Sequence, residues 1–168
     1  TTVSSTMAIA AEAGIRVFAT GGIGGVHPGY GTKLDVSADL VALGQYPVAV
    51  VTSGCKSVLD VQSTREALET LGVPVVGFGT DHFPAFYLRE SGATVDARFD
   101  DVADLAAFCA MELQRSGRGI VVANPIPAAD EIPRDDWELW LEGAEREVAE
   151  HTGRDRTPAL LAALHRIS

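Results

Sequence analysis

Lysine is scarce in this sequence of 168 residues, which holds only Lys33 and Lys56 beside eleven arginines. Basic residues are few overall, since 13 Lys and Arg stand against 23 Asp and Glu, and the formal net charge is −10. That deficit argues against a general nucleic-acid surface. Any bound phosphate would have to be held by backbone amides and a few cations.

Long hydrophobic runs are absent, and cysteine is rare. No apolar run approaches the length that spans a bilayer, so no membrane segment is expected. Cys55 and Cys109 lie far apart and form no C-x-x-C pair, which argues against a disulfide framework and against a thiolate metal site. A reducing cytoplasm is therefore the default compartment. Because the first residue is Thr1 and not methionine, the sequence leaves open a targeting segment upstream of it.

Helix-like and strand-like segments alternate along the chain. The apolar patterns predict strands at 15–19, 47–52, 73–78 and 119–123, and helices at 3–14, 37–43, 57–71, 101–115, 135–151 and 157–166. This alternation predicts an α/β fold, with a parallel-rich sheet covered by helices. The length suits a single domain over 1–168, with no internal repeat and no interdomain linker.

Polar or glycine-rich segments follow the expected strands, beginning at Thr20, Ser53, Thr80 and Asn124. Parallel α/β sheets bind ligands at the carboxyl ends of their strands, so a site is expected there. The segment 20–33 is rich in glycine, which lets backbone N–H groups approach an anion, but no G-x-G-x-x-G opens a helix. An anion site and a tight connection are equal alternatives for this loop.

Lys56 lies just after an expected buried strand, in the segment Ser53-Gly54-Cys55-Lys56-Ser57. Arginine cannot lose its proton in a protein, whereas a lysine amine can and then attacks carbonyl carbons. A helix beginning at Ser57 would place the amine beside a helix N-terminus, where the dipole disfavours an ammonium. The alternative is a fixed charge that neutralises a carboxylate or binds a phosphate, which is also the expectation for Lys33.

Asp35 and Asp39 lie four residues apart around an expected helix start. Two carboxylates with open water positions suit Mg²⁺ or Mn²⁺. Spacing alone favours the alternative, which is a charge pair at a helix N-terminus. His27 is a candidate acid–base group or a cap of its loop. Trp137 and Trp140, three apart on a terminal helix, are expected to serve core or subunit packing.

Four motifs, in this order and over essentially the whole chain, resemble the pseudouridine-5′-phosphate glycosidase family, also called indigoidine synthase A-like. They are FATGGIGGVH at 18–27, DVSADL at 35–40, GCKSVLD at 54–60 and VVANPIP at 121–127. The resemblance implies a three-layer α/β/α fold with a parallel-rich mixed sheet. It also implies a lyase that reversibly cleaves the carbon–carbon glycosidic bond of pseudouridine 5′-phosphate, giving uracil and ribose 5-phosphate.

The resemblance implies roles for particular residues. Lys56 would add to the anomeric carbon and open the ribose ring as an imine, while Asp35 would be a ligand of Mn²⁺. The substrate contacts that it implies are Val3, Thr20, His27, Ser37, Ala38 and Asp39. It further implies a homotrimer that acts on a small molecule, while the composition predicts a cytoplasmic protein with no nucleic-acid or membrane partner.

The chain also departs from the family pattern. The family's general-acid glutamate and a phosphate-binding lysine lie upstream of the matching region, and an asparagine-rich segment follows it. The sequence is therefore expected to be a fragment with weak or no turnover by itself. Cys55 stands where a small residue such as alanine is expected. Two other functions stay open: a different imine-forming sugar-phosphate lyase, and a non-catalytic phosphosugar-binding module.

Overall fold

The computed structural model of the chain describes residues 2–29, 31, 34–149 and 156–167. It divides into two compact units, Thr1–Glu131 and Ile132–Ser168. The sheet and the candidate site belong to the first unit, and a single domain over 1–168 stays a prediction. Lys33 and the expected helix end at His151 lie outside the described residues.

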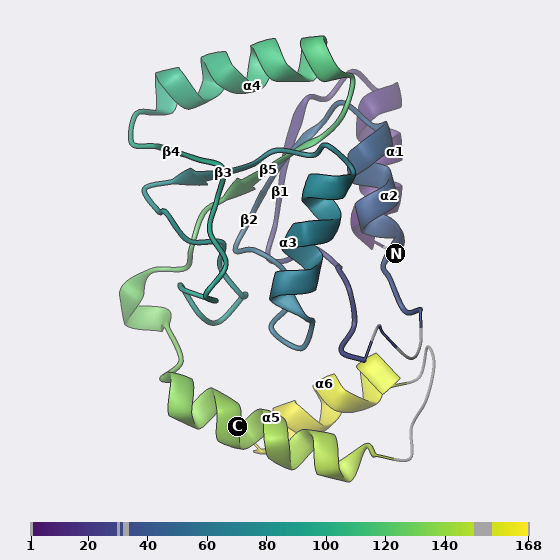
Figure 1. The fold of residues 1–168 in the computed structure, drawn as a ribbon, viewed down its shortest axis with the longest axis vertical. Coiled ribbons are helices and arrows are strands. Elements are labelled where there is room, and N and C mark those ends of the chain that lie inside the picture. The colour runs from purple at the N-terminus through teal and green to yellow at the C-terminus, as the bar shows by residue number, and fades with distance from the viewer. Residues whose placement is uncertain (1, 30, 32–33, 150–155, 168) are drawn as a thin grey trace. The chain divides into compact units, whose positions relative to one another are not determined.

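A parallel sheet with the strand order β1-β2-β5-β3-β4 forms the centre of the first unit (Figure 1). Its strands are β1 Val17–Thr20, β2 Ala49–Thr52, β3 Val75–Phe78, β4 Ala97–Phe99 and β5 Ile120–Ala123. All four strand pairings are parallel. Of the six isolated bridges among the described residues, five are antiparallel and one, between Ile23 and Cys55, is parallel. The predicted α/β fold with a parallel-rich sheet is confirmed.

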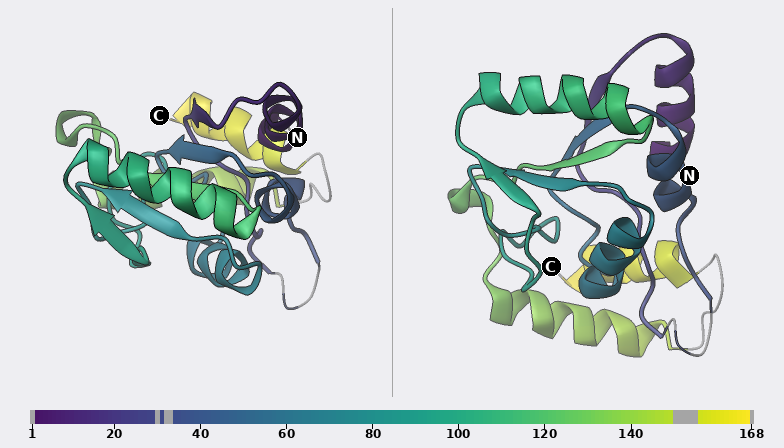
Figure 2. Two further views of the ribbon diagram at one scale, coloured as in Figure 1. Left: turned by 90° about the horizontal axis from the view of Figure 1, so that it is seen from above. Right: turned by 45° about the horizontal axis from the view of Figure 1, so that its top comes forward.

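Helices cover both faces of this sheet (Figure 2). Three of them, α1 Thr2–Glu12, α2 Ala38–Gln45 and α3 Val61–Thr70, lie on one face, and α4 Val102–Ser116 lies on the other. Handedness explains this division. The chain moves across the sheet in one direction from β1 through β2 to β3, and in the opposite direction from β4 to β5. Because a right-handed crossover puts its helix on the other face when the direction reverses, α4 lies on the face opposite α2 and α3.

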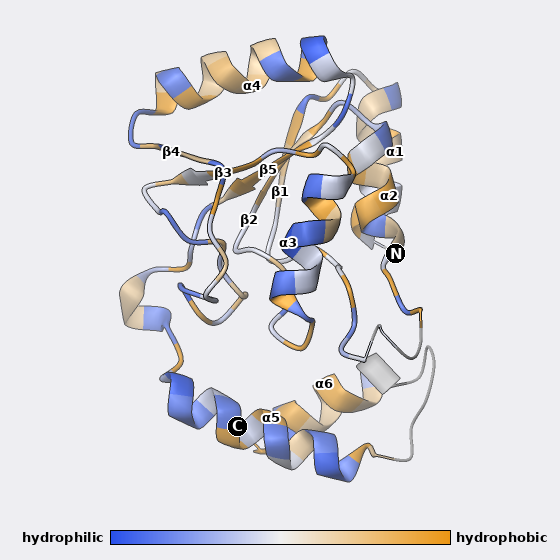
Figure 3. Ribbon diagram, in the orientation of Figure 1, coloured by the Kyte–Doolittle hydropathy of each residue, from blue (hydrophilic) through white to orange (hydrophobic). Residues whose placement is uncertain are grey.

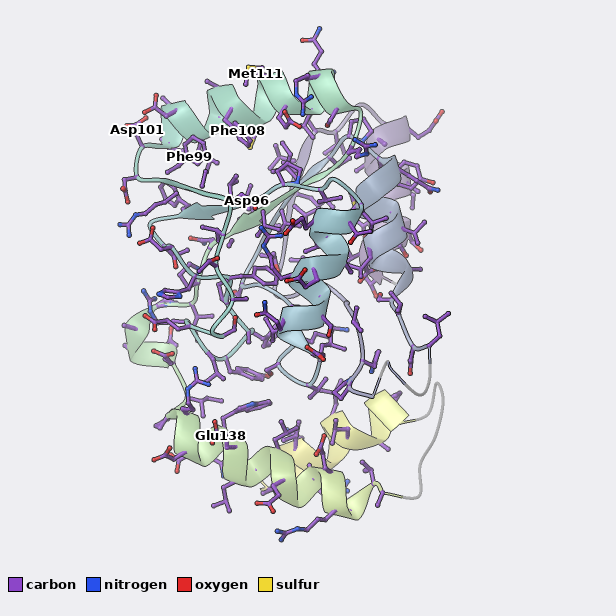
Figure 4. The ribbon with its side chains drawn as sticks, viewed as in Figure 1. Asp96, Phe99, Asp101, Phe108, Met111 and Glu138 are labelled. Atoms are coloured by element: carbon purple, nitrogen blue, oxygen red, sulfur yellow. The ribbon has the colours of Figure 1, made fainter. Side chains whose placement is uncertain are left out.

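The core beneath α4 is built from alternate residues of the strands, as the period of two in a β-strand requires. Cys109 and Leu113 of α4 pack on strand residues that are at least 97 % buried, namely Ala49, Val76, Ile120 and Val122. At the β4 end, the rings of Phe99 and Phe108 lie 5.2 Å apart between their centroids (Figure 4). Continuous apolar strands are typical of a parallel sheet that is buried on both faces.

Two features of the fold differ clearly from the sequence-based expectation. The helix expected from Ser57 begins at Val61, because Asp60 accepts a hydrogen bond from the Ser63 amide and thereby caps α3 (2.9 Å). Strand β4 was not predicted, since its three residues include Arg98 and lack the apolar run of a buried strand. Its place at the edge of the sheet explains why it tolerates an exposed charge.

An apolar groove of about 430 Å³ lies between α4 and the β1 side of the sheet. Its lining includes Val17, Ala49, Val51 and Leu105, and Val17 is 55 % exposed. The described residues that line the groove come from α4, from strands and from the position before β1, and include only Arg16 and Cys109 as titratable groups, so it is not the candidate site.

The second unit contains two helices, α5 Arg134–Glu147 and α6 Arg156–Ile167, which pack against each other. Figure 3 shows mostly polar residues along α5 and a more apolar α6. Trp137 is buried and Trp140 is half-buried, which agrees with a packing role. Every helix among the described residues is too short or too polar to cross a lipid bilayer.

Candidate active site

The carboxyl ends of three neighbouring strands meet at one edge of the sheet. Thr20, Thr52 and Ala123 end β1, β2 and β5 and lie in register across them. The amide of Asn124, the first residue after β5, donates to the carbonyl of Thr52 (2.9 Å). The loops that follow these strands therefore start side by side, as the parallel arrangement predicts.

The glycine-rich loop after β1 pairs with the segment that carries Lys56. The Ile23 amide donates to the Gly54 carbonyl (3.0 Å), and the Lys56 amide donates to the Ile23 carbonyl (3.1 Å). The Lys56 side chain is exposed, and its Cγ lies 3.6 Å from the position that a β-carbon on Gly22 would occupy. The backbone of Lys56 is thus fixed by the sheet edge, while its amine reaches outward beside the loop.

The expected support from a helix dipole is not present at Lys56. Helix α3 begins at Val61, and the carboxylate of Asp60 caps it. The field of a helix terminus falls off within about one turn, so a side chain five positions before the helix receives little of it. The environment of the amine is set instead by the two loops that flank it.

Three amides in the middle of the glycine-rich loop donate to acceptors inside the protein. The Ile23 amide donates to the Gly54 carbonyl (3.0 Å), and the Gly24 amide donates to the Asp39 carboxylate (2.9 Å). The Val26 amide donates to the Thr64 hydroxyl (3.0 Å). An amide that already donates to a buried acceptor cannot also hold a phosphate oxygen. At these three positions the loop therefore acts as a tight connection between elements, and its amides are not available to bind an anion.

Asp39 is a buried carboxylate that joins two segments of backbone. Its side chain is almost wholly enclosed, because the residue is 3 % exposed. Oδ1 accepts from the Ser4 amide and Oδ2 from the Gly24 amide, both at 2.9 Å. Ser4 lies in the first turn of α1, so Asp39 satisfies one of that helix's unpaired amides from 35 residues away. Asp39 therefore fixes the glycine-rich loop against the start of α1.

We expect Asp39→Asn to lower the free energy of unfolding by about 2 to 4 kcal/mol. The asparagine oxygen can accept from only one of the Ser4 and Gly24 amides, and its NH₂ group would then face the N–H of the other. The matched control is Asp101→Asn. A single Asp101 oxygen accepts from both Ala103 and Asp104, so asparagine replaces it with a change of about 0.5 kcal/mol or less. Urea denaturation of both variants measures the difference. Equal changes for the two would contradict the structural role of Asp39.

The predicted substrate contacts on α1 and α2 lie around this carboxylate. Val3 precedes Ser4 and is 6 % exposed. Ser37 caps α2 by accepting from the Asp39 amide (3.2 Å), and Ala38 is exposed at the start of that helix. Their contact with a substrate stays a prediction, and so does that of Asp39.

His27 and Asp35 are brought together by the backbone of the glycine-rich loop. The His27 amide donates to the Asp35 carbonyl (3.0 Å), and both side chains are half-buried.

Gly22 lies beside Lys56 and Gly24 beside Asp39, and residues two apart in a chain are separated by at most about 7 Å. The same short stretch of loop therefore passes both the stem of Lys56 and the buried carboxylate of Asp39.

Phe86 is a residue of this region that sequence reasoning missed. It is the single described non-glycine residue with a positive φ, 56°. Such a conformation disfavours a side-chain-bearing residue by about 1 to 3 kcal/mol. Its ring packs against the glycine-rich loop, with Cε2 3.2 Å from the place of a β-carbon on Gly21. The surrounding sequence Pro84-Ala85-Phe86-Tyr87 gives no signal for a positive φ at position 86, because glycine and asparagine are absent from it.

Cys55, which precedes Lys56, is enclosed and is therefore a poor nucleophile. Burial raises the pKa of the Cys55 thiol to about 12, and the nearby Asp60 carboxylate adds to the rise. Burial also raises the pKa of Cys109. Since the thiolate is the reactive form, both groups stay protonated and inert near neutral pH.

We therefore expect iodoacetamide at pH 8 to leave Cys55 and Cys109 unmodified in the folded protein and to modify both in denaturant. Peptide mass spectrometry gives the extent at each position. Modification of folded Cys55 at the rate of the unfolded chain would show that this thiol is accessible, against its burial.

The fold and this edge define an α/β protein with an exposed lysine at the carboxyl end of a parallel sheet. A profile of the indigoidine synthase A like protein family matches residues 1–168. The chain belongs to this family.

Relatives and solved structures agree with that assignment. A protein named pseudouridine-5′-phosphate glycosidase from Nocardioides sp. is 50% identical to this chain, and the match covers 100% of this chain and 56% of the relative. A protein of the same name from Methylobacterium nodulans is also 50% identical, and that match covers 98% of this chain and 50% of the relative. An indigoidine synthase A-like protein of Thermotoga maritima superposes with a TM-score of 0.86 at 40% identity, covering 98% of this chain and 55% of the other. The structure of the prealnumycin C-glycosynthase AlnA in complex with ribulose 5-phosphate superposes with a TM-score of 0.90 at 37% identity. That match covers 96% of this chain and 54% of the AlnA chain. The chain thus spans about half the length of the proteins it matches.

Proposed function

We propose that the protein to which this chain belongs cleaves the carbon–carbon glycosidic bond of pseudouridine 5′-phosphate, reversibly, to uracil and ribose 5-phosphate. One observation carries the proposal: the relatives that bear the name of this activity are half identical to the chain over its whole length. The exposed amine of Lys56 at the sheet edge supplies the reactive group that such chemistry needs.

The proposed step uses Lys56 as a nucleophile. In the cleavage direction its neutral amine adds to C1 of the ribose, and the ring oxygen leaves with the bonding electrons and takes a proton. The bond from C1 to the uracil carbon then breaks. Its electrons stay on the base, which takes a proton at that carbon, while the nitrogen lone pair completes the imine. Water adds to the imine and releases ribose 5-phosphate and the amine.

Within this scheme the other residues position the amine. The glycine-rich loop and the Lys56 segment share backbone hydrogen bonds, so the lysine backbone cannot shift without the loop. Asp39 fixes the far end of the same loop. Holding the reacting nitrogen at a defined place supplies the advantage of an intramolecular reaction.

Mn²⁺ at Asp35 also stays a proposal. Among the described residues no group of three His, Cys, Asp or Glu side chains is close enough to hold a metal ion. Both oxygens of Asp39 already accept backbone hydrogen bonds. Asp35 would then be the carboxylate that holds the ion, with water completing the shell, as such hard cations permit. When bound, the cation would supply positive charge to substrate oxygens.

A homotrimer, a cytoplasmic location and weak turnover by 1–168 alone complete the proposal. Light scattering on the whole protein tests the assembly. Comparison of its turnover with that of the 168-residue chain tests the last expectation, which rests on the family's proton donor lying outside the matched region.

Carbon–glycoside formation on another acceptor is a second candidate. The similarity to a C-glycosynthase that was solved with ribulose 5-phosphate favours it. Both candidates involve a phosphorylated pentose and a carbon–carbon bond, so the base distinguishes them. Release of free uracil from pseudouridine 5′-phosphate by the whole protein supports the glycosidase.

The experiment that tests the proposal traps the imine. The whole protein is incubated with ribose 5-phosphate and borohydride, and its peptides are examined by mass spectrometry. A reduced pentose phosphate adduct on Lys56 is expected, with none when the sugar is omitted. Full turnover without any adduct at that residue would reject the lysine mechanism.

A further inference from the structure

Residues 85–88 form a tight hairpin turn with an unusual residue at its first central position. The Ala85 amide donates to the Leu88 carbonyl (2.9 Å), and the Leu88 amide returns a bond to the Ala85 carbonyl (3.1 Å). Phe86 has a φ of 56°, and Tyr87 does not have a positive φ. A two-residue hairpin with a positive φ at its first central position alone is the type II′ pattern, where glycine is the usual residue.

The Phe86 ring occupies a defined place beside Lys56. Its Cδ2 and Cε2 lie 2.6 and 3.0 Å from the position of a β-carbon on Gly22, and Lys56 Cγ lies 3.6 Å from the same point. Only glycine at position 22 leaves room for the ring. The ring and the aliphatic stem of the lysine therefore flank one peptide of the glycine-rich loop.

The turn is also bound to the segment that leads into Lys56. The Phe86 amide donates to the Ser53 carbonyl (2.9 Å), and Gly54 and Ala85 form an antiparallel bridge. Any β-carbon on Gly54 would overlap the carbonyl of Pro84. The hairpin, the strand end and the lysine backbone thus move as one body.

A glycine at position 86 would relax the turn, yet the chain has a bulky aromatic residue there. Within the turn the Phe86 ring meets the neighbouring ring of Tyr87 edge-on, at 4.6 Å between centroids. Outside the turn it contacts the glycine-rich loop at Gly21 and Gly22, beside the stem of Lys56, so the ring has a use beyond the turn. Backbone strain that persists next to a reactive group is typical of functional sites.

We propose that Phe86 is a positioning residue for Lys56. The ring closes one side of the space around the lysine stem and fixes the loop opposite, so that the amine points toward the substrate carbon. This inference rests on the proposed imine chemistry. A lysine side chain has four rotatable bonds, and limiting its rotamers raises the fraction of molecules in which nitrogen and carbon are placed to react.

The test compares three forms of the whole protein: wild type, Phe86→Gly and Phe86→Tyr. Glycine keeps the turn and removes the ring, and it suits the positive φ, so this variant is expected to fold. Tyrosine retains the ring. Single-turnover imine formation with ribose 5-phosphate, trapped by borohydride, gives a maximal rate and a half-saturating concentration for each form.

We expect Phe86→Gly to lower the maximal rate by about 10- to 100-fold while the half-saturating concentration changes less than about threefold, since a misplaced nucleophile slows reaction more than binding. Phe86→Tyr should restore the rate to within about threefold. The inference is overturned if folded Phe86→Gly reacts at the wild-type rate, or if only its half-saturating concentration rises. Failure of wild type to form any adduct rejects the lysine chemistry on which this inference rests, whereas the release of uracil tests the proposed activity separately.

Discussion

Lys56→Arg is expected to reduce the turnover of pseudouridine 5′-phosphate by roughly 10³-fold or more and to prevent the trapped adduct. The variant keeps the positive charge but has no amine that can form an imine. Because the Lys56 side chain is exposed, the thermal midpoint should change little. Steady-state kinetics on the whole protein, together with borohydride trapping, measure the two effects.

The matched control is the same exchange at the other lysine. Lys33→Arg conserves charge at a position expected to act only as a cation, so turnover should stay within a few-fold of wild type. Wild-type turnover by Lys56→Arg would instead support a non-catalytic phosphosugar-binding module, for which a fixed charge suffices.

Gly54→Ala is expected to destabilise the protein by more than about 4 kcal/mol, a large part of the stability of a typical domain. Two effects act together at this position. Gly54 has a φ of 89°, which disfavours any residue with a β-carbon, and the added carbon would overlap the Pro84 carbonyl. Denaturant titration gives the loss, and the soluble yield should fall in parallel.

Gly14→Ala separates the two effects. Gly14 also has a positive φ, 73°, but nothing lies within 4 Å of its added β-carbon. This variant should therefore lose only the conformational part, about 1 kcal/mol. Similar losses for both variants would mean that the hairpin moves away from Gly54 without resistance, which would also weaken the positioning argument for Phe86.

Much of the fold could be predicted because the strands repeat a simple signal. Three of the four expected strands, those ending at Thr52, Phe78 and Ala123, are short apolar runs that match β2, β3 and β5 closely. The first, expected at 15–19, corresponds to β1. Their parallel pairing follows from the helices between them, and it places the following loops at one edge.

The rest depends on contacts between residues far apart in the sequence. A metal ligand and a substrate contact were the expectations for Asp35 and Asp39, but nothing local reveals that Asp39 binds the Ser4 amide. Phe86 was missed for the same reason, since its positive φ is imposed by its partners and not by its own preference. The late start of α3 reflects Asp60, a good cap that the apolar pattern alone does not place.

The bridge from Asp39 to Ser4 ties the start of α1 to α2. Because the two residues lie 35 positions apart, a long loop closes when this contact forms, and we expect the Ser4 amide to gain its acceptor only after α2 has docked. The amides of Ser4 and Gly24 share this acceptor group and should exchange their hydrogens for deuterium through one common opening. Exchange at the Ser4 amide therefore reports on whether the glycine-rich loop beside Lys56 is held in place.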